Sequence, residues 1–166
     1  EQAFKSLELM VVVDIAMTET ARLAHYVLPA ASQFEKLEAT GFTLEFPENY
    51  FHLRHPIAQP MGEALREPEI YTRLLETMGV IPRQFPVLTT IARNEPDLTG
   101  HLGYMTALGL TLSRNKRWAP YGASIMYRTL GKALRDAAAA PLLPIAMAYA
   151  KEHAVAVRRA EHKGSL

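Results

Sequence analysis

Asp14 closes a short run of β-branched residues, and it is the first side chain in the sequence that could do chemistry. Residues 9–13 read Leu-Met-Val-Val-Val, which predicts a strand buried on both faces, as in a parallel sheet. In open α/β sheets, ligands bind outside the carboxyl ends of the strands. A carboxylate placed there can accept two hydrogen bonds from a guanine edge or a ribose diol. The alternative is an aspartate that merely closes a turn or caps the next helix, and Asp14 taken alone favours this alternative.

Other signals of a site are weaker or missing. The sequence contains neither Gly-x-Gly-x-x-Gly nor a Gly-Lys-Ser/Thr loop, so the two commonest phosphate cradles are absent. It also contains no cysteine, which excludes disulfides, cysteine-bound zinc, iron–sulfur clusters and a thiol nucleophile within this chain. His52 and His55 have the spacing of a metal-ligating pair, but the neighbouring Pro56 and the extended context argue against a metal site.

The elements that would position Asp14 form an α/β unit. Thr18 is a good N-cap for a short helix, and residues 26–28 predict a second strand that Pro29 ends. Residues 42–58 are expected to be extended, with Tyr50, His52 and Arg54 on one face. A helix follows, in which Ile70, Leu74 and Met78 share one face and which Gly79 ends.

The second half of the chain predicts helices. Apolar residues recur at helical spacing after Pro96, in a first stripe (Leu98, Leu102, Met105, Leu108 and Leu112) and a second (Tyr127, Leu130 and Leu134). Residues 141–159 are rich in alanine, a strong helix former. We therefore predict an α/β segment with a parallel, Rossmann-like sheet at residues 1–80, a proline-rich linker at 81–97 and a helical insertion or appendage at 98–166.

Length and charge limit the function further. The chain has 166 residues, enough for one domain with or without an appendage, and no apolar run approaches the ~18 residues of a membrane span. Residues 1–80 carry a net charge of −6 and residues 81–166 one of +7. Such a split marks either a nucleic-acid or membrane surface or two segments with different neighbours in a larger protein. Scattered basic residues without interleaved aromatic side chains favour the second interpretation, and we expect no nucleic-acid partner.

A longer pattern carries more information than any single residue. It consists of Val-Val-Val-Asp at 11–14, Thr-Glu-Thr-Ala at 18–21, Val-Leu-Pro-Ala at 27–30, Glu-Lys at 35–36 and Gly-Glu-Ala at 62–64. Over roughly residues 5–80 this pattern resembles the molybdopterin oxidoreductases of the dimethyl sulfoxide reductase type. That family includes formate dehydrogenases, nitrate reductases and sulfoxide reductases.

The resemblance implies a specific cofactor, molybdenum bis-(molybdopterin guanine dinucleotide), held by α/β domains. It assigns Val13 and Asp14 to a guanosine end of the cofactor and places Lys36 on the cofactor as well. A lysine suits the pyrophosphate, which needs a point positive charge. The alternative for Lys36 is a surface lysine paired with Glu35 or Glu38. Glu67 takes the place of a family aspartate and is assigned to cofactor binding on that ground.

Two departures from the family pattern matter. His25 replaces the usual aspartate after Ala24, and we expect this histidine to lie on the surface. The residues from Phe42 to His55 replace an Asn-x-Glu-x-Arg run. Members of the family also hold a [4Fe–4S] cluster through cysteines and ligate molybdenum upstream of this segment. Without a cysteine the chain cannot hold that cluster, so we interpret it as an internal fragment of a parent protein that does.

Two functions follow. In the first, the fragment binds the guanosine-phosphate end of the cofactor, and the parent enzyme moves oxygen atoms, or hydride and electrons, on a small substrate; the fragment alone would be inactive. Its partners would be the remaining domains of the parent and electron-transfer subunits, in the cytoplasm. In the second, the chain is a non-catalytic interaction module that binds an acidic partner through its basic helical half.

Overall fold

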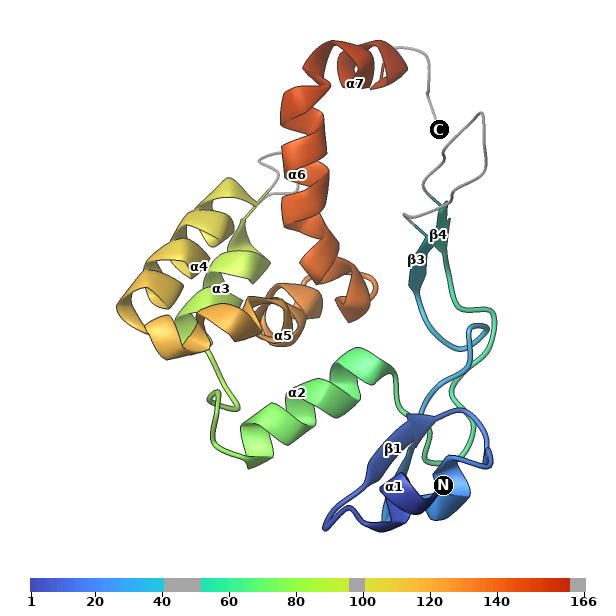
Figure 1. The fold of residues 1–166 in the computed structure, drawn as a ribbon. Coiled ribbons are helices and arrows are strands. Elements are labelled where there is room, and N and C mark those ends of the chain that lie inside the picture. The colour runs from blue at the N-terminus through green and yellow to red at the C-terminus, as the bar shows by residue number, and fades with distance from the viewer. Residues whose placement is uncertain (41–51, 96–100, 162–166) are drawn as a thin grey trace. The chain divides into compact units, whose positions relative to one another are not determined.

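A computed structural model describes residues 1–40, 52–95 and 101–161, and the chain divides into two compact units, residues 1–77 and 78–166 (Figure 1). The described elements of the first unit are α1 (Gln2–Lys5), β1 (Val11–Asp14), the 3-10 helix η1 (Ala21–Leu23), β2 (Tyr26–Pro29), β3 (Glu38–Thr40), β4 (His52–Arg54) and α2 (Glu67–Thr77). Those of the second are α3 (Pro86–Asn94), α4 (Leu102–Arg114), η3 (Lys116–Tyr121), α5 (Gly122–Arg128), η4 (Leu130–Lys132), η5 (Ala137–Leu142), α6 (Leu143–Glu152) and α7 (Ala154–Glu161). This order confirms the predicted fold class, an α/β segment followed by a helical segment.

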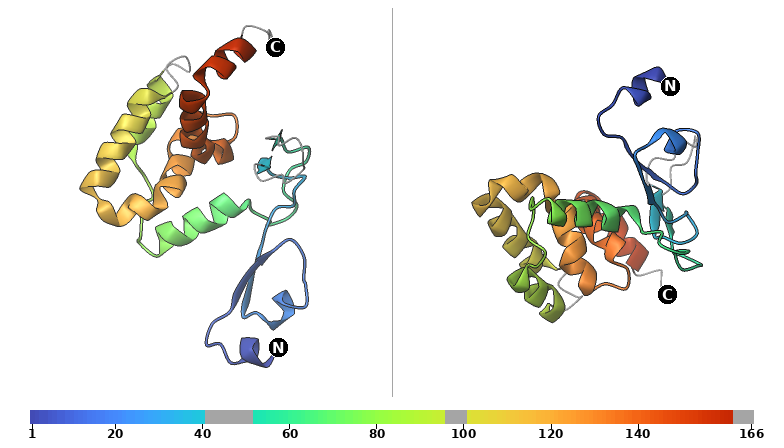
Figure 2. Two further views of the ribbon diagram at one scale, coloured as in Figure 1. Left: turned by 45° about the horizontal axis from the view of Figure 1, so that its top comes forward. Right: turned by 90° about the horizontal axis from the view of Figure 1, so that it is seen from below.

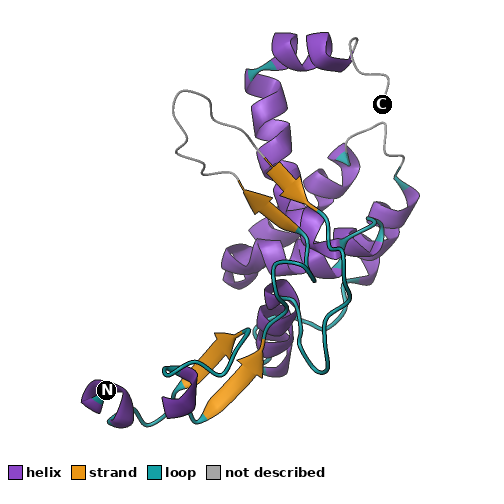
Figure 3. Cartoon of the chain, turned by 90° about the vertical axis from the view of Figure 1, so that its right-hand side faces the viewer, coloured by secondary structure: helices purple, strands orange, loops and turns teal. Residues whose placement is uncertain are grey.

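The α/β unit is built on a parallel pair, β1 and β2 (Figure 3). Val11 lies opposite Tyr26 and Asp14 opposite Pro29, so the two strands end at the same edge. The connection between them contains η1, whose Ala21 N–H donates to the Thr18 hydroxyl at 3.2 Å, as expected of a capping threonine. Beyond β2, Leu65 forms a parallel bridge with Ala30 and extends the pairing at that edge.

The expectation of a strand buried on both faces is wrong. Val11 is 45% exposed and Tyr26 is 64% exposed. A two-stranded ladder leaves its outer positions open to solvent, because burial on both faces needs further strands and covering layers. The apolar side chains of residues 9–13 are therefore only partly buried within the described part of this unit.

A second pair, β3 and β4, is antiparallel and sets Glu38 opposite Arg54. β4 lies within the stretch expected to be extended, and Leu53 alternates with His52 and Arg54 along it. β3 was not predicted, because Glu38 and Ala39 have low strand propensity and the pairing with β4 is what makes this segment a strand. Residues 41–51, including Tyr50 of the expected strand face, lie outside the described residues.

The predicted helix before Gly79 is α2, with Ile70 buried and Gly79 in the left-handed conformation (φ +69°) that ends a helix. Leu74 and Met78 of the expected apolar face are exposed, so this face is buried only at its N-terminal end. Ile70 and the half-exposed Leu74 line a small apolar pocket with Leu28 and Leu65, which places α2 beside the carboxyl end of β2.

In the second unit, α3 lies where a linker was expected at residues 81–97. Pro86 stands in its first turn, where the missing N–H costs nothing, and Leu88 and Ala92 are buried one turn apart. The prolines that suggested a loop therefore include one that begins a helix. α3 packs beside α4, whose Tyr104 and Leu108 are buried at the same spacing (Figure 2).

The remaining helices are shorter than the sequence predicts. Instead of one helix through Tyr127 and Leu134, α5 ends at Arg128 and η4 follows. At the break, the buried Thr129 hydroxyl donates to the Ile125 carbonyl at 2.6 Å and lies 2.7 Å from the Tyr104 hydroxyl. In the same way, the alanine-rich stretch is divided into α6 and α7 at His153. None of the described helices has the length and apolar character needed to cross a membrane.

The first testable prediction concerns Glu95, whose carboxylate caps α4. Its two oxygens accept the N–H groups of Gly103 and Tyr104, each at 2.7 Å. Because these are unpaired donors of a helix N-terminus, E95A should lower the free energy of unfolding by about 1 kcal/mol. The measurement is urea unfolding followed by the fluorescence of Trp118, the chain's single tryptophan, which lies in the same unit.

The control is E152A, at the exposed C-terminal end of α6. A carboxylate there opposes the helix dipole, so its removal should change the stability by less than about 0.5 kcal/mol. Equal losses in the two variants would contradict the capping role of Glu95.

Candidate functional site

Asp14 is held by the turn that follows β1. One carboxylate oxygen accepts the Ile15 N–H at 2.7 Å, and the other accepts the Thr18 hydroxyl at 3.0 Å. The Thr18 hydrogen bond is the largest of the effects that lower the pKa of Asp14 below its ordinary value of 3.8, and the backbone N–H groups of Ile15 and Ala16 lower it further. The side chain is therefore an anion at neutral pH.

Asp14 therefore closes a turn, which is the alternative considered from the sequence. Its carboxylate can also accept further hydrogen bonds from a ligand. A carboxylate has about four acceptor positions. Ile15 and, at 3.4 Å, Ala16 donate to one oxygen of Asp14, and Thr18 donates to the other, so acceptor capacity remains chiefly on the second oxygen. Asp14 stands at the end of β1, outside the packed interior. Its backbone carbonyl accepts the Ala30 N–H at 2.9 Å, which ties the turn after β1 to the segment after β2.

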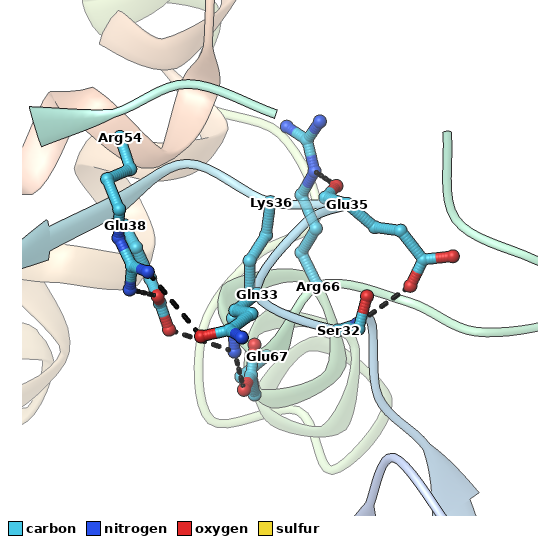
Figure 4. A network of polar contacts seen from close by, with 8 residues as sticks. All are labelled: Ser32, Gln33, Glu35, Lys36, Glu38, Arg54, Arg66 and Glu67. Carbon is cyan, nitrogen blue, oxygen red and sulfur yellow. Dashed lines mark hydrogen bonds and ion pairs between the residues drawn. The ribbon is translucent and has the colours of Figure 1, made fainter. Parts of the chain in front are cut away.

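The segment after β2 is fixed by Glu35. Its carboxylate accepts the N–H of Ser32 at 2.7 Å and that of Met61 at 2.9 Å, and its backbone carbonyl accepts Arg66 Nε at 3.3 Å (Figure 4). The Ser32 backbone hydrogen bond is the first cause of a lowered pKa at Glu35, followed by hydrogen bonds from the Ser32 side chain and the Met61 backbone. Glu35 thus connects its own turn with the segments at Met61 and Arg66, and this holds the backbone from which Lys36 extends.

That next residue, Lys36, is the centre of a chain of ion pairs (Figure 4). Its Nζ lies 2.5 Å from a Glu67 oxygen and 3.6 Å from a Glu38 oxygen. The side chain of Lys36 is only 15% exposed, so these contacts are partly shielded from water. Of the partners considered from the sequence, Glu38 is present and Glu35 turns elsewhere. The nearest partner is Glu67, whose pairing with Lys36 the sequence did not suggest.

Arg54 completes the cluster. It forms an ion pair with Glu38, its neighbour across the β3–β4 pair, and a 3.4 Å hydrogen bond with Gln33. Its Nε–H is buried and has no acceptor among the described residues. Two cations and two carboxylates therefore alternate in the order Arg54, Glu38, Lys36 and Glu67, and the formal charges sum to zero. We call these residues the Lys36 cluster.

The structure brings the predicted site residues together in two pairs. Val13 and Asp14 end β1, and Lys36 and Glu67 touch each other. No hydrogen bond or ion pair between described side chains joins one pair to the other. The sequence did not predict that Glu35 fixes the turn or that Glu38 pairs with Arg54, because these contacts join residues far apart in the chain and leave no local signal.

His25, His52 and His55 lie at or next to the ends of strands. His25 is exposed, and its Nδ1 accepts the Met10 N–H at 2.9 Å, just before β1 begins. His52 is the first residue of β4, and His55 follows its last residue. Within the described ranges, no group of three or more His, Asp or Glu side chains is arranged to hold a metal ion.

Comparison with known proteins identifies the α/β unit. The sequence model of the molybdopterin oxidoreductase family matches residues 1–77. This match confirms, over residues 1–77, the predicted resemblance to the molybdopterin oxidoreductases. No solved structure matches the chain significantly.

Individual relatives agree with this family. Over 79 residues, or 48% of this chain, the sequence is 43% identical to the F420-dependent formate dehydrogenase subunit alpha of Methanocaldococcus jannaschii. Over 91 residues, or 52% of this chain, it is 35% identical to the probable oxidoreductase YoaE of Bacillus subtilis. The matched part spans 11% of the first relative and 13% of the second.

The second prediction tests what holds Asp14 ionised. Replacing the Thr18 hydroxyl in T18V removes the main cause of the lowered pKa, so the pKa of Asp14 should rise toward its ordinary value. The matched control is T20V, because Thr20 lies in the same loop without a side-chain capping bond. The measurement is a carboxyl ¹³C NMR titration from pH 7 to pH 2.

The lowered pKa of Asp14 determines how the stability of the protein depends on pH. A carboxyl with a depressed folded pKa contributes stability above its unfolded pKa and loses it as the pH falls through the folded value. The stability of the wild type should therefore decline below about pH 4, and that of T18V should depend less on pH there. An Asp14 pKa that is the same in T18V and T20V would contradict this account.

Proposed function

We propose that residues 1–77 bind the guanosine-phosphate end of a molybdopterin guanine dinucleotide within a larger molybdenum oxidoreductase. In this proposal Asp14, with the backbone at Val13, binds the guanine edge, and Lys36 binds a phosphate. Glu67 acts on the cofactor through Lys36. The observation that carries the proposal is an ionised carboxylate with free acceptor positions at the carboxyl end of a parallel strand, inside a segment of this family.

The residues present fit such a ligand at both ends. A guanine edge presents neighbouring N–H donors, and Asp14 keeps acceptor positions beyond those that Ile15 and Thr18 use. At the other end, the ammonium of Lys36 has three N–H donors, of which one donates to Glu67, while Glu38 lies at ion-pair distance. The buried Nε–H of Arg54 supplies a further donor in the same cluster without a described acceptor.

The role of this segment is therefore binding and orientation. When bound, the molybdenum–pterin group would supply the oxygen-atom, or hydride and electron, transfer. The parent protein is proposed to hold a [4Fe–4S] cluster outside this chain and to act in the cytoplasm with electron-transfer subunits. Formate is a candidate substrate because relatives are named formate dehydrogenases.

A second candidate function concerns the helical unit. Arg114, Lys116 and Arg117 are exposed where α4 passes into η3, and the Arg117 guanidinium lies 5.6 Å from the centre of the Trp118 ring. Residues 81–166 carry the net charge of +7, so this unit could bind an acidic partner. Binding that weakens steeply with salt would support this function, and no binding at low salt would reject it.

The third prediction tests the guanine contact by titrating the full 166-residue chain with guanosine and GMP in ¹⁵N NMR. D14N should weaken the binding of both ligands about tenfold, because the amide loses the charge-assisted hydrogen bonds. Guanosine binding to the wild type should be constant from pH 8 to pH 5, since the pKa of Asp14 is below its ordinary value of 3.8, and should weaken on further acidification.

The matched control is E19Q, which removes the same charge from an exposed residue of the same turn region. It should leave both affinities within about twofold of the wild type. Amide spectra of D14N and E19Q report whether the fold is kept. Absence of guanosine binding to the wild type, or equal effects of D14N and E19Q, would overturn the proposal.

A further inference from the structure

We propose that the Glu67 carboxylate occupies, on Lys36, the place of a phosphate group of the guanine nucleotide ligand, and that it moves away when this phosphate binds. The inference rests on the proposed function, because it concerns the same ligand. It assigns to Glu67 the role of an internal competitor, where the sequence had suggested a direct cofactor contact.

The charge balance of the Lys36 cluster favours exchange of Glu67 for a phosphate. The cluster is neutral with Glu67 in place, so an added phosphate would meet an excess of negative charge next to a partly shielded lysine. If the phosphate takes the place of Glu67, cations and anions still alternate along the cluster. Exchange of one anion for another is therefore favoured over simple addition.

The contacts show which carboxylate can leave. Glu38 is held by two cations, Arg54 and Lys36, and belongs to the β3–β4 pair. Glu67 has only Lys36 as an ion-pair or hydrogen-bond partner among the described residues. Its side chain is 32% exposed, against 15% for Lys36, so it can turn into solvent while the lysine stays.

The same helix turn provides a matched control. Glu69 lies two residues further along α2 and pairs with Arg73 at 2.6 Å. E67Q and E69Q thus remove the same charge from the same turn, but only E67Q frees Lys36. Any general effect of the protein's charge on an anionic ligand is common to both variants.

The experiment titrates the full chain and its variants with GMP, with guanosine and with inorganic pyrophosphate. E67Q should bind GMP and pyrophosphate about fivefold more tightly than E69Q, with guanosine affinities equal within about twofold. K36Q should lose pyrophosphate binding and bring the GMP affinity down to that of guanosine. E67A should repeat the result of E67Q, and thermal unfolding of each variant reports whether the fold is kept.

The outcomes separate this inference from the proposed function. If guanosine binds and D14N weakens it, but E67Q equals E69Q or weakens GMP, the competitor role of Glu67 is overturned and the guanine site stands. If no guanosine binds to the wild type, the proposed function fails. A pyrophosphate response of E67Q that exceeds that of E69Q would then still establish the competition at Lys36.

Discussion

The parallel ladder between β1 and β2 is the interaction on which the candidate site depends. Because parallel strands end at one edge, the turn that carries Asp14 and the segment that leads to Lys36 begin side by side. The hydrogen bond from Ala30 to the Asp14 carbonyl and the bridge between Ala30 and Leu65 continue this edge beyond the strands. A slip of one residue in the ladder would turn every side chain to the opposite face and separate these functional groups.

Beyond this edge, the described residues are held mainly by polar contacts between side chains. Asp14 folds its own turn, Glu35 joins its turn to the loop at Met61, and the Lys36 cluster joins β3, β4 and the start of α2. Such partly exposed networks are weaker than an apolar core and respond to pH and salt. That property suits a binding edge, because a charged ligand can exchange with internal partners at a modest cost in free energy.

The helical unit is stabilised in another way. Its fully buried side chains include Tyr104, Ile125 and Leu130, and the Phe85 and Trp118 rings meet edge to face at 5.6 Å. The hydroxyl of Tyr104 reaches Thr129 where α5 ends, so the one polar atom of this large side chain is satisfied inside the core. Burial of the phenol raises its pKa, which keeps the hydroxyl protonated and able to donate.

Local patterns were enough to predict several features of this chain. The β-branched run before Asp14, the capping threonine at 18, the stop at Pro29 and the glycine after α2 each act within a few residues, so the parallel unit and the helix could be found in the sequence. The motif spacing also identified the family that residues 1–77 match. The α3 helix was missed because its proline served as a helix start, a role that composition alone does not separate from a loop.

Tertiary structure decided the partners of the charged residues. Glu38 meets Arg54 only because β3 and β4 pair across sixteen positions, and Glu67 reaches Lys36 across thirty-one. A short segment of sequence does not predict which carboxylate will pair with a lysine ammonium, because Coulomb attraction depends on distance in space and on shielding from water. The sequence by itself therefore determined which residues are candidates for binding a guanine nucleotide, and the folded chain decided that Lys36 pairs with Glu67 and Glu38.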